Sequence, residues 1–110
     1  MSLDVSLMLQ GNEHSISVFE WNITHNLIEM AAEAGIYEYL WSPEEKGATT
    51  ASDLIAPLEA GLELLKSDPE RFKAFNPPNG WGNYEGLVEF VTEYLKVCRN
   101  FPACVIAISR

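Results

Sequence analysis

Two stretches of alternating apolar and polar residues open the 110-residue chain and leave it few choices of fold. In residues 2–9 every second side chain is apolar, namely Leu3, Val5, Leu7 and Leu9. Residues 15–23 alternate in a similar way, with Phe19, Trp21 and Ile23 on one face. A period of two is typical of a β-strand with one buried face, and residues 11–14 have turn chemistry. The chain therefore opens with a predicted β-hairpin.

The apolar period changes to that of an α-helix at Thr24, which is a good N-cap directly after the second strand. The helical spacing continues to Leu40, and Gly35 either ends this helix or provides a small contact point. Residues 50–53 have the spacing of a capping box, which predicts the start of a second helix. Pro57 lies within the apolar stripe of that helix and predicts a kink or a later start.

Two more helices and a strand complete the predicted order. Pro69 has the favoured first position of a short helix, and an apolar stripe from Leu87 to Cys98 predicts a long one. Residues 103–109 are apolar on both faces, which predicts a strand covered by helices. The order β-β-α-α-(short α)-α-β predicts one α+β domain over residues 1–110, with helices packed on a small antiparallel or mixed three-stranded sheet.

Charge is distributed unevenly along the chain. Residues 1–50 hold eight of the 16 acidic residues and a single base, Lys46, so the negative net charge of −9 is concentrated there. The sequence has no basic cluster, which argues against a nucleic-acid partner. It also has no apolar run of the length that a membrane span needs. A basic protein partner fits this charge, although solubility alone also accounts for it.

The sequence offers no cofactor or metal motif. Cys98 and Cys104 predict two buried free thiols in a reducing compartment, which favours a cytoplasmic location. His14 and His25 have no Glu or Cys at a ligand-like spacing, so no metal site is predicted. Phosphate loops, nucleophile elbows and Cys-His arrangements are absent from the sequence, so we assign neither a cofactor nor a catalytic residue.

Two segments rich in amide and aromatic side chains each precede a predicted helix. They are residues 21–26, WNITHN, and residues 76–86, NPPNGWGNYEG. Such side chains line pockets for small polar ligands because they orient a ligand without net charge, and helix N-termini attract anions. A small polar or anionic ligand is therefore expected. The candidate ligand-binding residues are Asn22, His25, Asn26, Asn79, Trp81, Tyr84 and Glu85.

The alternative interpretation of both segments is structural. Residues 76–86 then reverse the chain, with Trp81 closing the edge of the core and Asn83 capping the last helix. His25 then bonds a neighbouring carbonyl group. A shared site requires that the two segments meet, which happens if the last strand pairs antiparallel to a central first strand. We expect this arrangement.

The segments NITHNL, EAGIYEYLWSPEE and FNPPNGWGNYEG resemble a family of small proteins of bacteria and their phages. The similarity extends over most of the chain. The family has no established activity, so the resemblance implies no catalytic or binding residues. It implies a cytoplasmic accessory protein of a prokaryote or a virus.

Three functions remain open at this point. The first is non-catalytic binding of a small polar or anionic ligand at the two helix N-termini. The second is an acidic protein-interaction module of the inhibitor or immunity type, which the charge of residues 1–50 favours. The third is a small enzyme that uses His25 with Glu85. An exposed edge of the first strand would also allow a homodimer.

Overall fold

The computed structural model describes residues 1–11 and 14–110, so the turn predicted over residues 11–14 lies partly outside the described residues. The strands are β1 (Ser2–Gln10), β2 (Ser15–Thr24) and β3 (Val105–Ser109). The helices are α1 (Ile28–Glu33), α2 (Tyr37–Trp41), α3 (Ser52–Ser67), α4 (Pro69–Lys73) and α5 (Tyr84–Asn100). Two 3-10 turns, η1 (His25–Leu27) and η2 (Pro43–Lys46), precede α1 and follow α2. The predicted α+β fold is confirmed.

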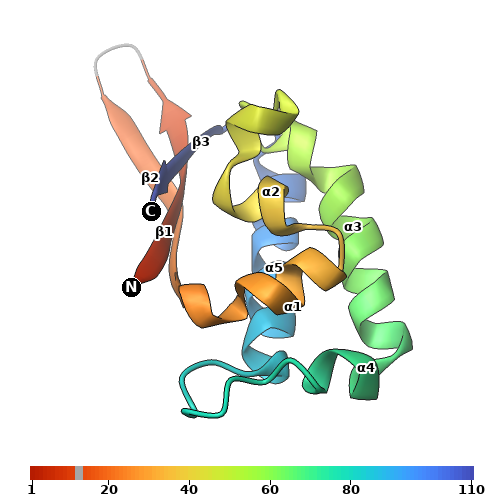
Figure 1. The fold of residues 1–110 in the computed structure, drawn as a ribbon. Helices are drawn as coiled ribbons and strands as arrows, with labels where there is room; N and C mark the ends of the chain where they lie inside the picture. Colours follow the sequence, from red (N-terminus) through yellow and green to blue (C-terminus); the bar gives the residue numbers. More distant parts are fainter. Residues whose placement is uncertain (12–13) are drawn as a thin grey trace.

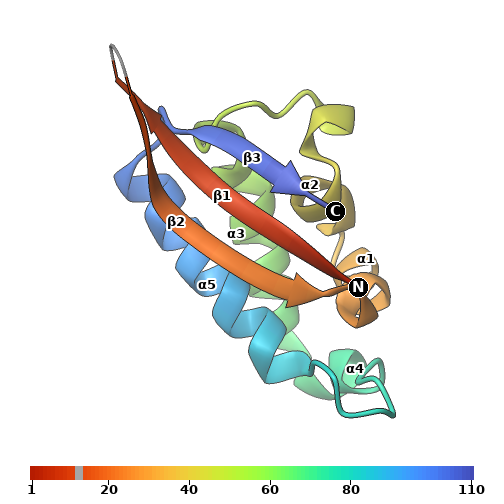
Figure 2. The ribbon, with the colours of Figure 1, turned by 90° about the vertical axis from the view of Figure 1, so that its left-hand side faces the viewer.

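β1 lies in the middle of a three-stranded antiparallel sheet of order β2-β1-β3 (Figure 2). Leu3 and Val5 pair with Ile23 and Trp21 across the hairpin, so the alternating apolar residues share one face of the sheet. Both edges of β1 are occupied by neighbouring strands. β1 is thus the central strand, and the outer edges of the sheet belong to β2 and β3. A homodimer stays a prediction, and pairing at a sheet edge would use β2 or β3.

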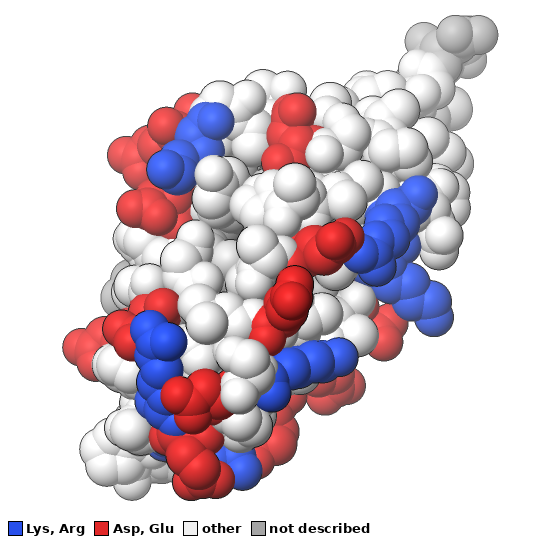
Figure 3. All heavy atoms as spheres, turned by 90° about the vertical axis from the view of Figure 1, so that its right-hand side faces the viewer, with Lys and Arg blue, Asp and Glu red and all other residues white. Residues whose placement is uncertain are grey.

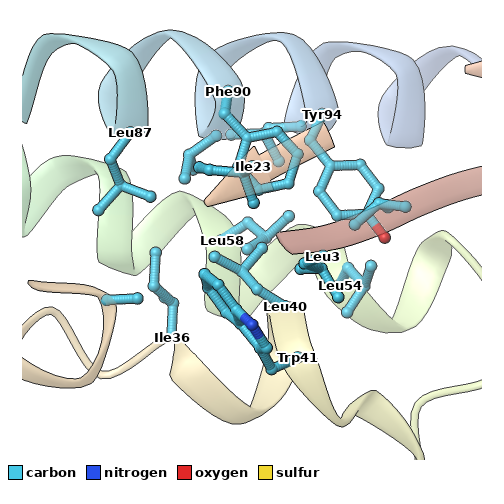
Figure 4. Close-up of a cluster of buried hydrophobic side chains, with 14 of the residues drawn as sticks. Leu3, Ile23, Ile36, Leu40, Trp41, Leu54, Leu58, Leu87, Phe90 and Tyr94 are labelled. Atoms are coloured by element: carbon cyan, nitrogen blue, oxygen red, sulfur yellow. The ribbon is translucent and has the colours of Figure 1, made fainter. Parts of the chain in front are cut away.

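The helices cover one face of the sheet, and α5 lies against β2 and beside α3 (Figure 1). Fully burying a large apolar side chain stabilises a fold by about 1.5–3 kcal/mol. The sheet and the helices both contribute such side chains to one core, which thereby fixes the helices on the sheet. Figure 4 shows several of them: Leu3, Leu40, Trp41, Leu54, Leu58, Phe90 and Tyr94.

Gly35 ends the first helical run, which is one of the two roles predicted for it. Its φ of 77° lies in the left-handed region that glycine adopts at low cost. The N–H groups of Gly35 and Ile36 donate to the carbonyl groups of Ala32 and Ala31, both at 3.0 Å. These two bonds make a Schellman cap. The helical spacing that continues from Thr24 to Leu40 is therefore divided among three elements, η1, α1 and α2.

The start of α3 contains one half of the predicted capping box, the bonds to the Asp53 carboxylate. Asp53 Oδ2 accepts the N–H of Thr49 at 3.0 Å and the N–H of Thr50 at 3.2 Å. These hydrogen bonds lower the pKa of the Asp53 carboxyl group. α3 begins at Ser52 and includes Pro57, so the alternative of a later start is wrong. The cap fixes the first turn ahead of the proline.

β3 is an edge strand, and the prediction that helices cover both of its faces is wrong. Its residues alternate between exposed and half-buried. Ile106 and Ile108 pack against the core, whereas Val105 is exposed. The segment before α3 pairs with the start of β3 through the N–H of Ile106, which donates to the Thr49 carbonyl at 3.0 Å.

Candidate functional site

The two amide-rich segments meet at one end of the sheet. Asn26 Nδ2 donates to the carbonyl of Trp81 at 3.2 Å, across 55 residues of sequence. Gly82 also lies close to the end of β2, because a Cβ atom at this position would be 2.6 Å from Thr24 Cγ2. The loop before α5 lies beside η1 and the start of α1 (Figure 1). The predicted meeting of the segments is confirmed, since β3 pairs antiparallel to a central β1.

An open groove of about 550 Å³ lies where the segments meet. Four of its lining residues are predicted ligand residues: Asn22, Asn26, Asn79 and Trp81. We call it the Asn–Trp groove, and its complete lining is Met1, Ser2, Asn22, Thr24, Asn26, Asn79 and Trp81. All these side chains are uncharged, so the groove combines hydroxyl groups, amides and one aromatic ring.

Trp81 exposes its indole ring to solvent, while both its main-chain N–H and its carbonyl are hydrogen-bonded. Its N–H donates to Asn79 Oδ1 at 2.9 Å, and its carbonyl accepts from Asn26. The flanking residues Gly80 and Gly82 have φ values of 78° and 96°, which other residues adopt only at a cost. The side chain is 71% exposed. Trp81 therefore does not close the edge of the core, as the structural interpretation expected.

The partners of the three amides fix which amide atom is nitrogen and which is oxygen. Asn22 Nδ2 donates to Asp4 Oδ1 at 2.7 Å, and only the nitrogen can bond an ionised carboxylate. Asn26 must likewise offer its nitrogen to the Trp81 carbonyl. Asn79 must offer its oxygen to the Trp81 N–H. The oxygens of Asn22 and Asn26 and the nitrogen of Asn79 are thus the amide atoms not used in these bonds.

A second open groove of about 710 Å³ adjoins the first and contains His25. It shares Asn26 and Asn79 with the Asn–Trp groove, and Glu29 also lines it. His25 Nε2 is buried and has no hydrogen-bond partner among the described residues. The described bonds therefore do not include the expected bond from the His25 side chain to a neighbouring carbonyl. The main-chain N–H of His25 donates to the Met1 carbonyl at 3.2 Å.

Two predicted ligand residues lie elsewhere. Tyr84 is buried, and its hydroxyl donates to the Leu65 carbonyl at 2.7 Å, so it belongs to the core. Glu85 lines neither groove among the described residues, and its carboxylate lies 4.0 Å from Lys73 Nζ. Both follow Asn83 in the first turn of α5, where the helix period turns them away from the loop.

Two N–H groups in the first turn of α5 have side-chain partners within the chain. The N–H of Tyr84 donates to Asn76 Oδ1 at 2.8 Å, and that of Gly86 donates to Asn83 Oδ1 at 2.7 Å. The predicted cap by Asn83 is therefore confirmed. These two N–H groups are therefore already used and do not favour an anionic ligand at this helix end.

Sequence reasoning missed a third groove, of about 530 Å³, between η2 and β3. Arg110 Nη1 bonds Glu44 Oε1 at 2.9 Å and the Trp41 carbonyl at 2.6 Å beside it, and the first of these bonds lowers the pKa of Glu44. Arg110 and Glu44 are 66 residues apart in sequence, so no local pattern signals the contact. The lining residues are Pro43, Glu44, Ala48, Thr49, Val105, Ile106, Ile108 and Arg110.

The two thiols are buried and unpaired, as predicted. Burial raises the pKa of Cys98 to about 12, which leaves it protonated and a poor nucleophile at neutral pH. Within residues 1–11 and 14–110, no group of three His, Cys, Asp or Glu side chains is placed to hold a metal ion.

The chain matches no protein-family model, no curated protein and no solved structure. The resemblance to small bacterial and phage proteins therefore stays a prediction. Among the described residues, no helix has the length and apolar character needed to cross a bilayer.

Proposed function

We propose that this domain binds a small, uncharged polar ligand in the Asn–Trp groove. One observation carries the proposal: the Trp81 indole is 71% exposed beside amides that come from a segment 55 residues away. Ligand sites are concave, with an apolar surface and a few polar groups that fix the orientation of the ligand. The Asn–Trp groove combines these features on a main chain that internal hydrogen bonds hold in place.

The held backbone matters for affinity. Binding costs free energy when loops and side chains must become ordered, so a preformed site loses less on association. Asn26 and Asn79 bond the carbonyl and the N–H of Trp81, and the Gly82 backbone lies against Thr24 and Leu27. The ligand therefore meets a loop whose main chain is already held beside η1.

The test is protein-observed NMR with a panel of neutral sugars, nucleosides and amino-acid amides. We expect selective shifts of the Trp81 indole N–H and of the Asn79 side-chain amide. Trp81→Ala should abolish these shifts. Phe101→Ala is the matched control, because Phe101 is another exposed aromatic residue, 40% exposed, at the opposite end of α5. An unresponsive groove across the whole panel would rule out the proposal.

The alternative of an acidic interaction module receives less support. Its basis was the charge of residues 1–50, yet two acids of that half pair with bases of the other half. Glu33 lies 2.7 Å from Arg71, and Glu44 lies 2.9 Å from Arg110. On the face shown in Figure 3, acidic and basic side chains lie beside one another instead of forming one acidic patch. A small enzyme that uses His25 with Glu85 is also less supported, because Glu85 does not line the groove that contains His25.

A further inference from the structure

We infer that the ligand of the Asn–Trp groove is a neutral sugar. This inference rests on the proposed function and names its ligand class. It follows from three properties of the groove: the mixture of donors and acceptors that its amides leave available, the flat exposed face of Trp81, and the absence of charge among its lining side chains.

The amides leave both kinds of hydrogen-bonding group. Asn22 uses both N–H groups, one toward Ser2 Oγ at 2.8 Å and one toward Asp4, so its oxygen is left as an acceptor. Asn79 uses its oxygen toward Trp81, so its two N–H groups are left as donors among the described bonds. A sugar hydroxyl both donates and accepts, and it can satisfy either amide. A carboxylate can only accept, and an ammonium group can only donate.

The indole ring supplies the complementary apolar surface. A pyranose ring has faces made of C–H groups and an edge made of hydroxyl groups, so it can stack on an aromatic face while its edge bonds amides. Trp81 offers such a face at the same groove as the amides of Asn22, Asn26 and Asn79. The hydrogen bonds of the Trp81 main chain to Asn79 and Asn26 keep the residue that carries this face beside both amides.

Electrostatics separates neutral sugars from their charged derivatives. No Lys or Arg side chain lines the described groove, and the protein carries a net charge of −9. The carboxylate of Asp4 is bonded to Asn22, which lines the groove. A sugar phosphate or a uronic acid would thus bring a negative charge to a protein that is already negative, at a groove with no Lys or Arg side chain to receive it.

Asn79→Asp tests the donor argument directly. The aspartate keeps an oxygen for the Trp81 N–H, so the loop keeps its internal bond, but it loses both N–H groups that would face the ligand. We expect unchanged thermal stability and a loss of sugar affinity of about tenfold or more, with a similar loss in Trp81→Ala. Trp81→Phe should lose less, because it keeps a flat ring.

The experiment is an NMR titration of the wild-type chain and these variants with neutral hexoses and disaccharides, glucose 6-phosphate, uridine, adenosine and amino-acid amides. Binding of neutral sugars, weaker binding of the phosphate and loss in Asn79→Asp are the supporting results. Binding of a nucleoside or an amide, without any shifts on addition of sugars, would overturn the assignment of the ligand to the sugars and leave the proposed function standing. If no compound causes shifts, both the sugar assignment and the proposed function are overturned. Sugar binding that Trp81→Ala and Asn79→Asp leave unchanged would overturn the assignment to this groove.

Discussion

The Tyr84 hydroxyl connects two helices at a point where one of them lacks hydrogen bonds. It donates to the carbonyl of Leu65, in the last turn of α3, at 2.7 Å. The last four carbonyl groups of a helix have no partner inside the helix. Ser67 Oγ satisfies the carbonyl of Leu64 in the same way, at 2.7 Å. Tyr84 thus fastens the start of α5 to the end of α3.

Tyr84→Phe should lower the free energy of unfolding by about 1–3 kcal/mol, because a buried carbonyl then loses its only side-chain donor among the described residues. Urea denaturation followed by circular dichroism measures this change. Tyr39→Phe is the control, since the Tyr39 hydroxyl makes no hydrogen bond within the described chain and should change stability little. Ligand binding in the Asn–Trp groove should be unaffected by Tyr84→Phe. Loss of the ligand-induced NMR shifts in this variant would show that Tyr84 contributes to binding.

The residue types of the two amide-rich segments predicted where the Asn–Trp groove lies. They did not predict which of the candidate side chains face it. Asn22, Asn26, Asn79 and Trp81 line the groove as predicted, and their amide and aromatic character is what a sequence shows. Tyr84 was assigned to the wrong environment although a signal existed. It lies three residues before Leu87 on the buried stripe of α5, so the helix period places it in the core.

Element boundaries were predictable where local chemistry decides them. The Asn83 cap, the first position of Pro69 in α4 and the stop at Gly35 all follow from short-range rules. The surroundings of β3 were not predictable in this way. An apolar segment of five residues fits both an edge strand and a covered strand, and the difference depends on neighbours distant in sequence.

The loop between α4 and α5 contains two glycines that separate backbone strain from a tertiary contact. Gly80 and Gly82 both have positive φ, so alanine should cost about 1–2 kcal/mol at either position. Only at position 82 would a Cβ atom meet a neighbour, Thr24 Cγ2 at 2.6 Å. We therefore expect Gly82→Ala to cost about 1–3 kcal/mol more than Gly80→Ala in urea denaturation. Equal losses of unfolding free energy in the two variants would show that Gly82 is not in close contact with the end of β2.

A second glycine contact joins α3 to the segment before α2. A Cβ atom at Gly61 would clash with Ile36 Cγ2, so Gly61→Ala should destabilise the fold despite its better helix propensity. Ile36→Ala alone should cost about 2–5 kcal/mol, because Ile36 is fully buried. In the double variant the added methyl group fills the vacated space, so the loss should be smaller than the sum. An additive double-mutant cycle would contradict this contact.

At the scale of the whole molecule, ion pairs join parts of the chain that the sequence separates. Arg71 pairs with Glu33, Arg99 with Glu59 and Arg110 with Glu44, over 38, 40 and 66 residues. These pairs are partly exposed, so each contributes little to stability. The pairs of Arg71 with Glu33 and of Arg110 with Glu44 show why the charge of residues 1–50 could not be treated as one acidic surface. Folding brings these two arginines of the second half to acids of the first.

The acid sensitivity of the fold should depend on Asp53, whose pKa is lowered by the N–H groups of Thr49 and Thr50. A carboxyl group whose folded pKa lies below its unfolded value of about 4 contributes stability above that value. This contribution is lost as the pH falls through the folded pKa. Glu44 shares this sign through Arg110. We therefore expect the urea midpoint to fall more steeply below about pH 4 in the wild-type chain than in Asp53→Asn, which keeps an acceptor oxygen but does not titrate.

Glu63→Gln is the matched control for that comparison, because it removes one negative charge from an exposed position of the same helix without touching the cap. It corrects for the relief of charge repulsion that acid brings to a chain of net charge −9. Its midpoint should follow the wild-type profile below about pH 4. If the urea midpoint of Asp53→Asn fell with acid as steeply as that of Glu63→Gln, the prediction would be contradicted. The Asp53 carboxylate would then not stabilise the connection between Thr49 and Thr50, which pair with β3, and the start of α3. The hydrogen bonds of Asp53 to the Thr49 and Thr50 N–H groups would then contribute nothing measurable to the free energy of unfolding. Thr49 would in that case be held mainly by its carbonyl, which accepts the N–H of Ile106 in β3.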